Sequence, residues 1–258
     1  MACFDRELLR LVPKVLRARD FYLYLEGGKR LTDLWRSGGR AVLGHKRPRV
    51  LAELKNSAER GLFCAFPHPL EKRFIKALGG LFPGRSFRLY LNESSLRLAL
   101  DKASLSGPVP IWRPFLENTA AAFFTPVLPF PLGPEVLVME KNMEDSFPQG
   151  ELIPPVLLAP AARALHDLMA AIKAGKAPGY RKIEKALCQA QSDGKGIWQR
   201  RGIYITTETK GGAYKDLFIK FLEGGFLIPP SPVEPVILPF SMSPGEEAKL
   251  AELLVPNP

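Results

Sequence analysis

Apolar residues along this chain recur at helical spacing in some segments and form short continuous runs in others. Apolar positions three to four residues apart predict amphipathic helices over residues 6–19, 49–60, 70–78, 94–103, 159–174, 180–190, 214–222 and 244–254. Runs rich in aromatic and branched residues predict strands over residues 21–25, 30–34, 86–91, 135–139 and 236–240, and a turn into a strand over 198–205. Mixed helices and strands in this order predict an α/β protein.

Glycine and proline mark the connections between these segments. Residues 26–29, Glu-Gly-Gly-Lys, predict the turn of a hairpin that joins the first two strands. Gly61 is a candidate left-handed cap for the helix before it, and Gly79-Gly80 are expected to close the helix over 70–78. Frequent prolines between residues 107 and 131 exclude long helices and central strands there, so extended segments and turns are predicted.

The net charge of +10 changes the set of partners to consider. Such a charge suits nucleic acid, an anionic membrane surface or an anionic small molecule. Basic residues are concentrated in the first predicted helix, which is interrupted near Pro13. We expect the apolar side of this helix to pack on its own protein with its basic face in solvent. A nucleic-acid or membrane face is the less favoured alternative, because no aromatic stacking platform accompanies it.

The chain contains no uninterrupted apolar run of about 18 residues, so no membrane span is expected. Its charged beginning does not predict a signal peptide, and a cytoplasmic location is expected. The three cysteines, Cys3, Cys64 and Cys188, lie far apart without a C-x-x-C pair. This spacing predicts free thiols that are buried or partly buried, and it indicates neither a disulfide framework nor a zinc site.

Residues 21–100 carry the most specific pattern in the chain. A D/E-G-x-x-[YL]-x-D pattern is matched over residues 26–33, and Leu43-Gly44-His45 with Pro48 matches an L-G-H-x-x-P entry into a helix. This segment resembles the opening of class III, fold-type I pyridoxal-phosphate aminotransferases, the glutamate-1-semialdehyde aminomutase group included. His45 is interpreted as a hydrogen-bonding or capping residue rather than a catalytic one. The end of the chain resembles the same family through a helix followed by residues 224–231, Gly-Gly-Phe-Leu-Ile-Pro-Pro-Ser.

The resemblance also identifies candidate cofactor-binding residues. A strand that runs directly into a helix leaves backbone N–H groups free for a phosphate, and in the family this junction reads N-S-G-[TS]-E-A. Here it reads Asn92-Glu93-Ser94-Ser95-Leu96. The resemblance implies pyridoxal phosphate as cofactor, with Ser94 and Ser95 as its binding residues, and capping of the helix is their alternative role. The family's glycine, which lets the backbone approach the phosphate, is missing from this junction, and Glu93 brings a like charge toward a bound phosphate.

The middle of the chain departs from the family. Three features of the family are not recognisable here: the Y-H-G segment, the strand ending in D-E and the Schiff-base lysine before a glycine run. The resemblance therefore covers roughly two thirds of the chain, at its two ends. Lys210, in Glu-Thr-Lys-Gly-Gly over residues 208–212, is the weak candidate for a catalytic lysine. The alternative interpretation of Lys210 is a flexible charged loop.

These observations predict a truncated fold-type I aminotransferase-like protein. Residues 1–69 are assigned to the N-terminal segment of the small domain, residues 70–158 to a remnant of the large cofactor domain, and residues 159–258 to the C-terminal small domain. The small α+β domain is thereby built from both chain ends. The predicted function is a class III aminotransferase-like protein that is degenerate and without ordinary transaminase activity.

Two other functions stay open at this point. One is an active pyridoxal-phosphate-dependent transaminase or aminomutase with a rearranged site. The other is a basic interaction or nucleic-acid-binding module on a reused fold. The family builds its sites across dimer interfaces, so the resemblance implies a homodimer. An anionic small molecule is a further expected partner, and nucleic acid a less favoured one.

Overall fold

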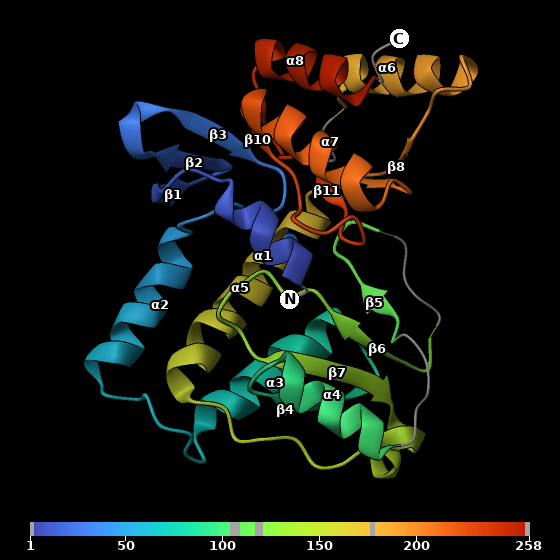
Figure 1. Ribbon diagram of the computed structural model, residues 1–258. Coiled ribbons are helices and arrows are strands. Elements are labelled where there is room, and N and C mark those ends of the chain that lie inside the picture. The colour runs from blue at the N-terminus through green and yellow to red at the C-terminus, as the bar shows by residue number, and fades with distance from the viewer. Residues whose placement is uncertain (1–2, 104–108, 117–120, 176–178, 256–258) are drawn as a thin grey trace. The chain divides into compact units, whose positions relative to one another are not determined.

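The computed structural model of this protein describes residues 3–103, 109–116, 121–175 and 179–255 (Figure 1). The chain forms two compact units, one of Met1–Lys46 with Lys176–Pro258 and one of Arg47–Gly175. Both chain ends share one unit, with limits that differ from the predicted boundaries at 69/70 and 158/159. The helix Pro48–Glu59 packs against the helix Pro155–Lys173, and this contact places both helices in the second unit. Whether the two units correspond to the family's small and cofactor domains stays a prediction.

The first unit is built from the two ends of the chain. Its elements are α1 (Cys3–Arg10), β1 (Val15–Arg19), β2 (Tyr22–Leu25), β3 (Arg30–Asp33), α6 (Arg181–Ser192), β8 (Trp198–Arg201), β9 (Tyr204–Thr207), α7 (Gly211–Glu223), β10 (Phe226–Leu227), β11 (Val236–Ile237) and α8 (Pro244–Leu254). Short 3-10 turns occupy Glu26–Gly28 and Ser37–Gly39.

A four-stranded sheet in the order β1-β2-β3-β10 joins the two ends. Strands β2 and β3 form the predicted antiparallel hairpin, and both Gly27 (φ 80°) and Gly28 (φ 79°) take the left-handed conformation that its turn requires. β10 then pairs in parallel with β3, so a C-terminal segment completes an N-terminal sheet. A second sheet of three strands has the order β11-β9-β8.

Residues 15–19 form a strand and not the second part of the predicted N-terminal helix. The helix α1 ends at Arg10, before Pro13, and β1 then pairs antiparallel with β2. Alternation of apolar and basic residues fits either structure, and pairing with β2 decides between them. The guanidinium of Arg17 lies 4.1 Å from the ring centroid of Tyr24 on that strand. The basic face predicted for the interrupted helix is therefore divided between α1 and β1.

The helix α8 begins as the sequence predicts. Ser243 accepts a hydrogen bond from the backbone N–H of Glu246, and the Glu246 carboxylate accepts one from the backbone N–H of Ser243, which together form a capping box. The same carboxylate accepts hydrogen bonds from Tyr22 at 3.2 Å and Arg30 at 3.0 Å. Burial by itself would raise the pKa of Glu246, but the hydrogen bonds from Ser243 and the charge of Arg30 lower it overall.

The second unit contains the central part of the chain. Its elements are α2 (Pro48–Glu59), α3 (Pro69–Leu81), β4 (Arg85–Tyr90), α4 (Glu93–Lys102), β5 (Ile111–Trp112), β6 (Phe123–Pro126), β7 (Glu135–Glu140), a 3-10 turn (Lys141–Ser146) and α5 (Pro155–Lys173). The strands form one sheet in the order β4-β7-β6-β5, with β7 antiparallel to both neighbours. The predicted strand over 86–91 and the short extended segments among the prolines are thus present.

Several helix boundaries differ from prediction, among them the end of α3 and the starts of α5 and α7. Gly79 and Gly80 do not close α3, which continues to Leu81 and ends before Pro83. A Cβ at Gly80 would lie 3.3 Å from the sulfur of Met169 on α5, so the glycine permits close packing of these two helices. α5 begins at Pro155, earlier than predicted, because proline fits the first turn of a helix.

α5 is the one helix in the described residues that is long and apolar enough to cross a membrane by length and composition. Within the second unit it packs against both α2 and α3, and 56% of its apolar window is buried. This burial is typical of the core helix of a folded unit.

Candidate functional site

The junction between β4 and α4 is the first candidate site. Asn92 caps α4, since its side-chain oxygen accepts a hydrogen bond from the backbone N–H of Ser95 at 2.9 Å. The cap is therefore Asn92, and the predicted capping role of Ser94 and Ser95 is wrong. The backbone N–H of Leu91 donates to the Glu151 carboxylate at 2.8 Å, which places another negative charge beside the junction.

Glu93 occupies the first position of α4. Its carboxylate lies 2.5 Å from the guanidinium of Arg97, and both side chains are mostly exposed. Ser94 is exposed and Ser95 half-buried, so two hydroxyls stand in the same turn as this carboxylate. A carboxylate repels a phosphate, and Asn92 already accepts the N–H of Ser95. The groups present at this junction therefore do not fit the phosphate of pyridoxal phosphate.

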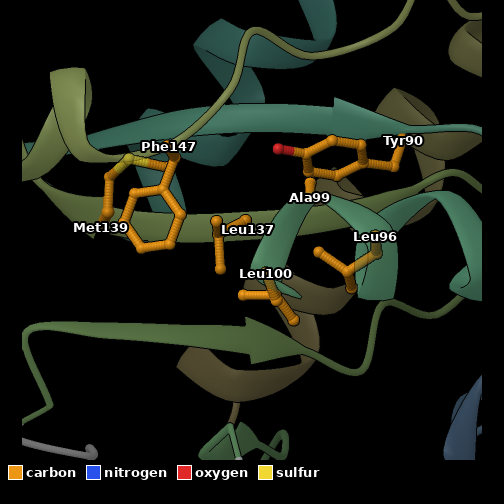
Figure 2. Close-up of a cluster of buried hydrophobic side chains, with 7 residues drawn as sticks. All are labelled: Tyr90, Leu96, Ala99, Leu100, Leu137, Met139 and Phe147. Carbon is orange, nitrogen blue, oxygen red and sulfur yellow. The ribbon is translucent and has the colours of Figure 1, made fainter. Parts of the chain in front are cut away.

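Buried apolar contacts hold α4 against β4 and β7, as Figure 2 shows. The cluster consists of Tyr90, Leu96, Ala99, Leu100, Leu137, Met139 and Phe147. β7 is buried on both faces, because alternate side chains of a strand point to opposite sides and all four of its central residues are buried. The β4–α4 junction is thus well packed although its exposed turn lacks a phosphate cradle.

Lys210 lies where the sequence places it, between β9 and α7. It is the N-cap residue of α7 with extended backbone, and its side chain is exposed. Immediately before it, the hydroxyls of Thr207 and Thr209 are hydrogen-bonded to each other at 3.0 Å. Lys210 belongs to the first unit, whereas Ser94 and Ser95 belong to the second.

The exposure of lysines bears on catalysis more broadly. Over residues 3–103, 109–116, 121–175 and 179–255, every lysine is exposed except Lys220, which is half-buried. A Schiff-base lysine needs a desolvated or electropositive pocket around its amine, and an exposed side chain does not provide a desolvated one.

A buried aspartate and a histidine form the most constrained polar pair in the first unit. Asp33 is 3% exposed and ends β3. One of its carboxylate oxygens accepts the backbone N–H groups of Trp35 and Arg36 at 2.9 and 2.8 Å. The other oxygen lies 2.8 Å from Nε2 of His45. His45 is therefore a hydrogen-bonding residue, as predicted, and does not cap α2, whose N-cap is Arg47.

Arg36 is a charged residue that sequence reasoning missed. Its side chain is fully buried, and its guanidinium donates to the backbone carbonyls of Val42, at 3.0 Å, and Ile237. It also lies 5.1 Å from the ring centroid of Phe21. Burial lowers the pKa of Arg36 to about 10, although the negative charge of Asp33 acts to raise it. Arg36 thereby connects the loop after β3 to the C-terminal segment of the unit.

The described residues contain no group of three or more histidine, cysteine, aspartate or glutamate side chains placed to hold a metal ion. Cys64 and Cys188 are free, but both are exposed, so the predicted burial of these thiols is wrong.

The chain is similar in sequence to several known proteins. No protein-family model matches the chain. The chain is 25% identical over 288 residues to an uncharacterized protein of Treponema pallidum (strain Nichols), in an alignment that covers 93% of each chain. It is 33% identical over 93 residues to a glutamate-1-semialdehyde 2,1-aminomutase of Thermus thermophilus, which is 34% of this chain and 22% of the aminomutase.

Solved structures define the fold. The ornithine delta-aminotransferase of Plasmodium falciparum matches with a TM-score of 0.67 and 12% identity, over 95% of this chain and 92% of that chain. Further aminotransferase and transaminase structures match with TM-scores of 0.62 or more. The chain therefore has the mixed α/β fold of the class III pyridoxal-phosphate aminotransferases, as the sequence resemblance predicted.

Proposed function

We propose that this protein is a degenerate member of the class III aminotransferase fold, without ordinary transaminase activity. The observation that carries the proposal is the exposure of its lysines: no lysine in the described residues is buried. A Schiff-base lysine must be a neutral amine when it attacks the cofactor, which needs a desolvated or electropositive pocket. An exposed amine such as that of Lys210 has neither.

The composition of the β4–α4 junction supports the same proposal. Pyridoxal phosphate is the cofactor to which the fold resemblance points, and its phosphate requires close backbone approach and an electropositive cradle. The turn at Glu93 offers a carboxylate paired with Arg97 instead. Ser94 and Ser95 supply hydroxyls, but these do not offset the charge beside them.

The alternative of an active enzyme with a rearranged site would need a lysine, a phosphate cradle and a carboxylate in one pocket. Lys210 is exposed at the start of α7, and the Glu93 carboxylate stands beside Ser94 and Ser95. These observations favour the degenerate form over the rearranged enzyme.

The proposed form is a shortened one in which the family's catalytic middle has been replaced. The Treponema pallidum protein aligns over 93% of its own length, and a Borreliella burgdorferi protein, 24% identical, over 90% of its own. These alignments favour a shortened form that other proteins share. They argue against a decayed gene product. A cytoplasmic location and a homodimer remain part of the proposal, the first in keeping with the soluble-enzyme-like fold.

Reductive trapping tests the proposal. Purified protein is incubated with pyridoxal phosphate, reduced with borohydride and mapped by mass spectrometry, with Lys210→Arg as the matched variant and a pyridoxal-phosphate aminotransferase as positive control. We expect sparse labelling spread over exposed lysines, equal in the wild type and Lys210→Arg. Stoichiometric labelling of one lysine in the wild type would contradict the proposal and identify the catalytic residue.

A further inference from the structure

The strand β1 is an edge strand of the sheet β1-β2-β3-β10, so within the described residues only one of its two sides pairs with a neighbouring strand. On the paired side, Arg17 lies opposite Tyr24 and Arg19 opposite Tyr22. The other side is open. Backbone groups along an open edge are a template on which a further strand can pair.

The backbone N–H and C=O of Ala18 point toward the open side of β1. On β2, the N–H of Leu25 donates to the carbonyl of Lys29, so Leu25 directs its backbone groups toward β3. Successive residues of a strand alternate in this direction, so Tyr24 directs its groups toward β1, where Arg17 is its partner. Ala18 follows Arg17 and therefore directs its groups away from β2. In the part of the chain that the structure describes, no other segment hydrogen-bonds to them.

Two arginines flank Ala18 on one face of β1, because residues two apart in a strand share a face. The guanidinium of Arg17 lies 4.1 Å from the ring centroid of Tyr24, and this stacking holds it in place. Among the described residues Arg17 has no carboxylate partner. Arg19 lies 3.4 Å from the carboxylate of Asp20 in an exposed pair, which a competing carboxylate can replace at little cost.

Acidic side chains of the neighbouring segments do not cancel this positive charge. Over residues 6–30 the chain carries seven basic and three acidic side chains. Glu26 forms an exposed ion pair with Lys14 at 3.6 Å. The carboxylate of Glu246 is held by Arg30 at 3.0 Å and by Tyr22 at 3.2 Å, on β3 and β2 rather than on β1. The edge at β1 therefore favours an acidic partner.

Apolar side chains on the same strand are exposed as well. Leu16 is 69% exposed and Val15 45% exposed. Leu16 lies where the register with β2 shifts between Val15 and Arg17. Because an exposed leucine on an edge strand favours association, a partner that carries only charge would leave this surface uncovered.

Nucleic acid fits this edge less well than a peptide does. The sheet carries two tyrosines on β2, but the guanidinium of Arg17 lies over the ring of Tyr24 and that of Arg30 over the ring of Tyr22, each at 4.1 Å from the ring centroid. Bases would have to displace these contacts in order to stack on the rings.

A membrane surface and a second copy of the chain also fit poorly. Lipid offers no hydrogen-bond partner to the backbone N–H and C=O of Ala18. Two β1 strands paired antiparallel about Ala18 would set Arg17 of each copy opposite Arg19 of the other, and like charges directly opposite each other destabilise a sheet.

We propose that β1 binds an extended acidic segment of a partner protein, which adds to the sheet as a fifth strand. The backbone of the segment pairs with the N–H and C=O of Ala18. Its carboxylates, at every second residue, face Arg17 and Arg19, and the apolar residues that alternate with them cover Leu16. This interaction is independent of whether pyridoxal phosphate binds.

Fluorescence anisotropy with the labelled peptide Gly-Glu-Val-Glu-Val-Glu-Val-Gly tests the interaction. One control peptide has lysine in place of each glutamate, and another has proline in place of each valine, which keeps the charge but prevents strand pairing. We expect saturable binding of the glutamate–valine peptide that weakens as salt is raised, no binding of the lysine peptide, and about ten-fold weaker binding of the proline peptide. No saturable binding at millimolar concentration, or equal affinity for the proline peptide or for a labelled oligothymidylate, would overturn the proposal.

Variants locate the binding. Ala18→Pro removes the outward N–H without removing a hydrogen bond to β2, and we expect the glutamate–valine peptide to bind about ten-fold more weakly. The double variant Arg17→Gln/Arg19→Gln removes the charge and should weaken binding by about the same factor, which keeps the test decisive if Ala18→Pro fails to fold. Arg201→Gln, at an exposed position on β8, the edge strand of the second sheet, is the matched control and should bind as the wild type does. Unchanged affinity in a folded Ala18→Pro protein or in the double variant would overturn the proposal.

Discussion

Replacing Arg36 with methionine is the sharpest test of how the two chain ends are held together. The substitution keeps much of the buried aliphatic length and removes the guanidinium. That group donates to the carbonyl of Val42, in the N-terminal segment, and to the carbonyl of Ile237, in the C-terminal segment. Arg36→Met therefore breaks two connections at once and leaves both carbonyls without this donor.

The size of the effect follows from two opposing contributions. Each hydrogen bond from a charged donor stabilises by about 1.5–3 kcal/mol, so two contribute roughly 3–6 kcal/mol. Burial of the cation costs free energy, as the lowered pKa of about 10 for Arg36 indicates, and methionine removes that cost. We expect a net loss of about 2–4 kcal/mol in the free energy of unfolding, a large share of a typical total of 5–15 kcal/mol.

Urea unfolding followed by circular dichroism measures this loss. The matched control is Arg97→Met, which removes an exposed guanidinium from an ion pair with Glu93 and should change the free energy of unfolding by less than about 0.5 kcal/mol. An Arg36→Met protein as stable as the wild type, or more stable, would refute the reasoning. The free-energy cost of burying the Arg36 charge would then exceed the stabilisation from its hydrogen bonds.

Three further predictions concern packing, pH and assembly. Gly150→Ala should destabilise by about 1–3 kcal/mol in thermal or urea unfolding, because a Cβ there would lie 2.8 Å from the backbone N and O of Leu89. The pKa of Glu246 is lowered from its ordinary 4.5, so its stabilisation is present above that value and is lost as pH falls through the folded pKa. The melting temperature of Glu246→Gln should therefore be below that of the wild type near pH 6, and the difference should shrink as the pH falls below 4.5 through the folded pKa. Size-exclusion chromatography with light scattering should give a homodimer, and a monomer at high concentration would remove that proposal.

Local sequence signals predicted the elements whose geometry is set within a few residues. The hairpin at Gly27 and Gly28, the left-handed Gly61 (φ 69°) and the helix over residues 244–254 are all present, because each depends on backbone conformation or on neighbours close in the chain. The family motif around His45 likewise predicted the fold, which the solved aminotransferases confirm.

Features decided by partners distant in sequence were missed. Residues 15–19 become a strand through pairing with β2, and Gly80 stays inside α3 because Met169 packs against it. The pair of His45 and Asp33 needs a fold that brings together residues twelve positions apart. Nothing in the sequence around Arg36 marks it as buried, since an arginine in a glycine-containing loop is ordinarily exposed.

Spectrophotometric titration with pyridoxal phosphate tests the central claim most directly. The account predicts no saturable new absorbance band, because no lysine in the described residues is buried and the β4–α4 turn carries the Glu93 carboxylate. A saturable new absorbance band, displaced by a competing amine, would contradict it and show that the protein is a working pyridoxal-phosphate enzyme.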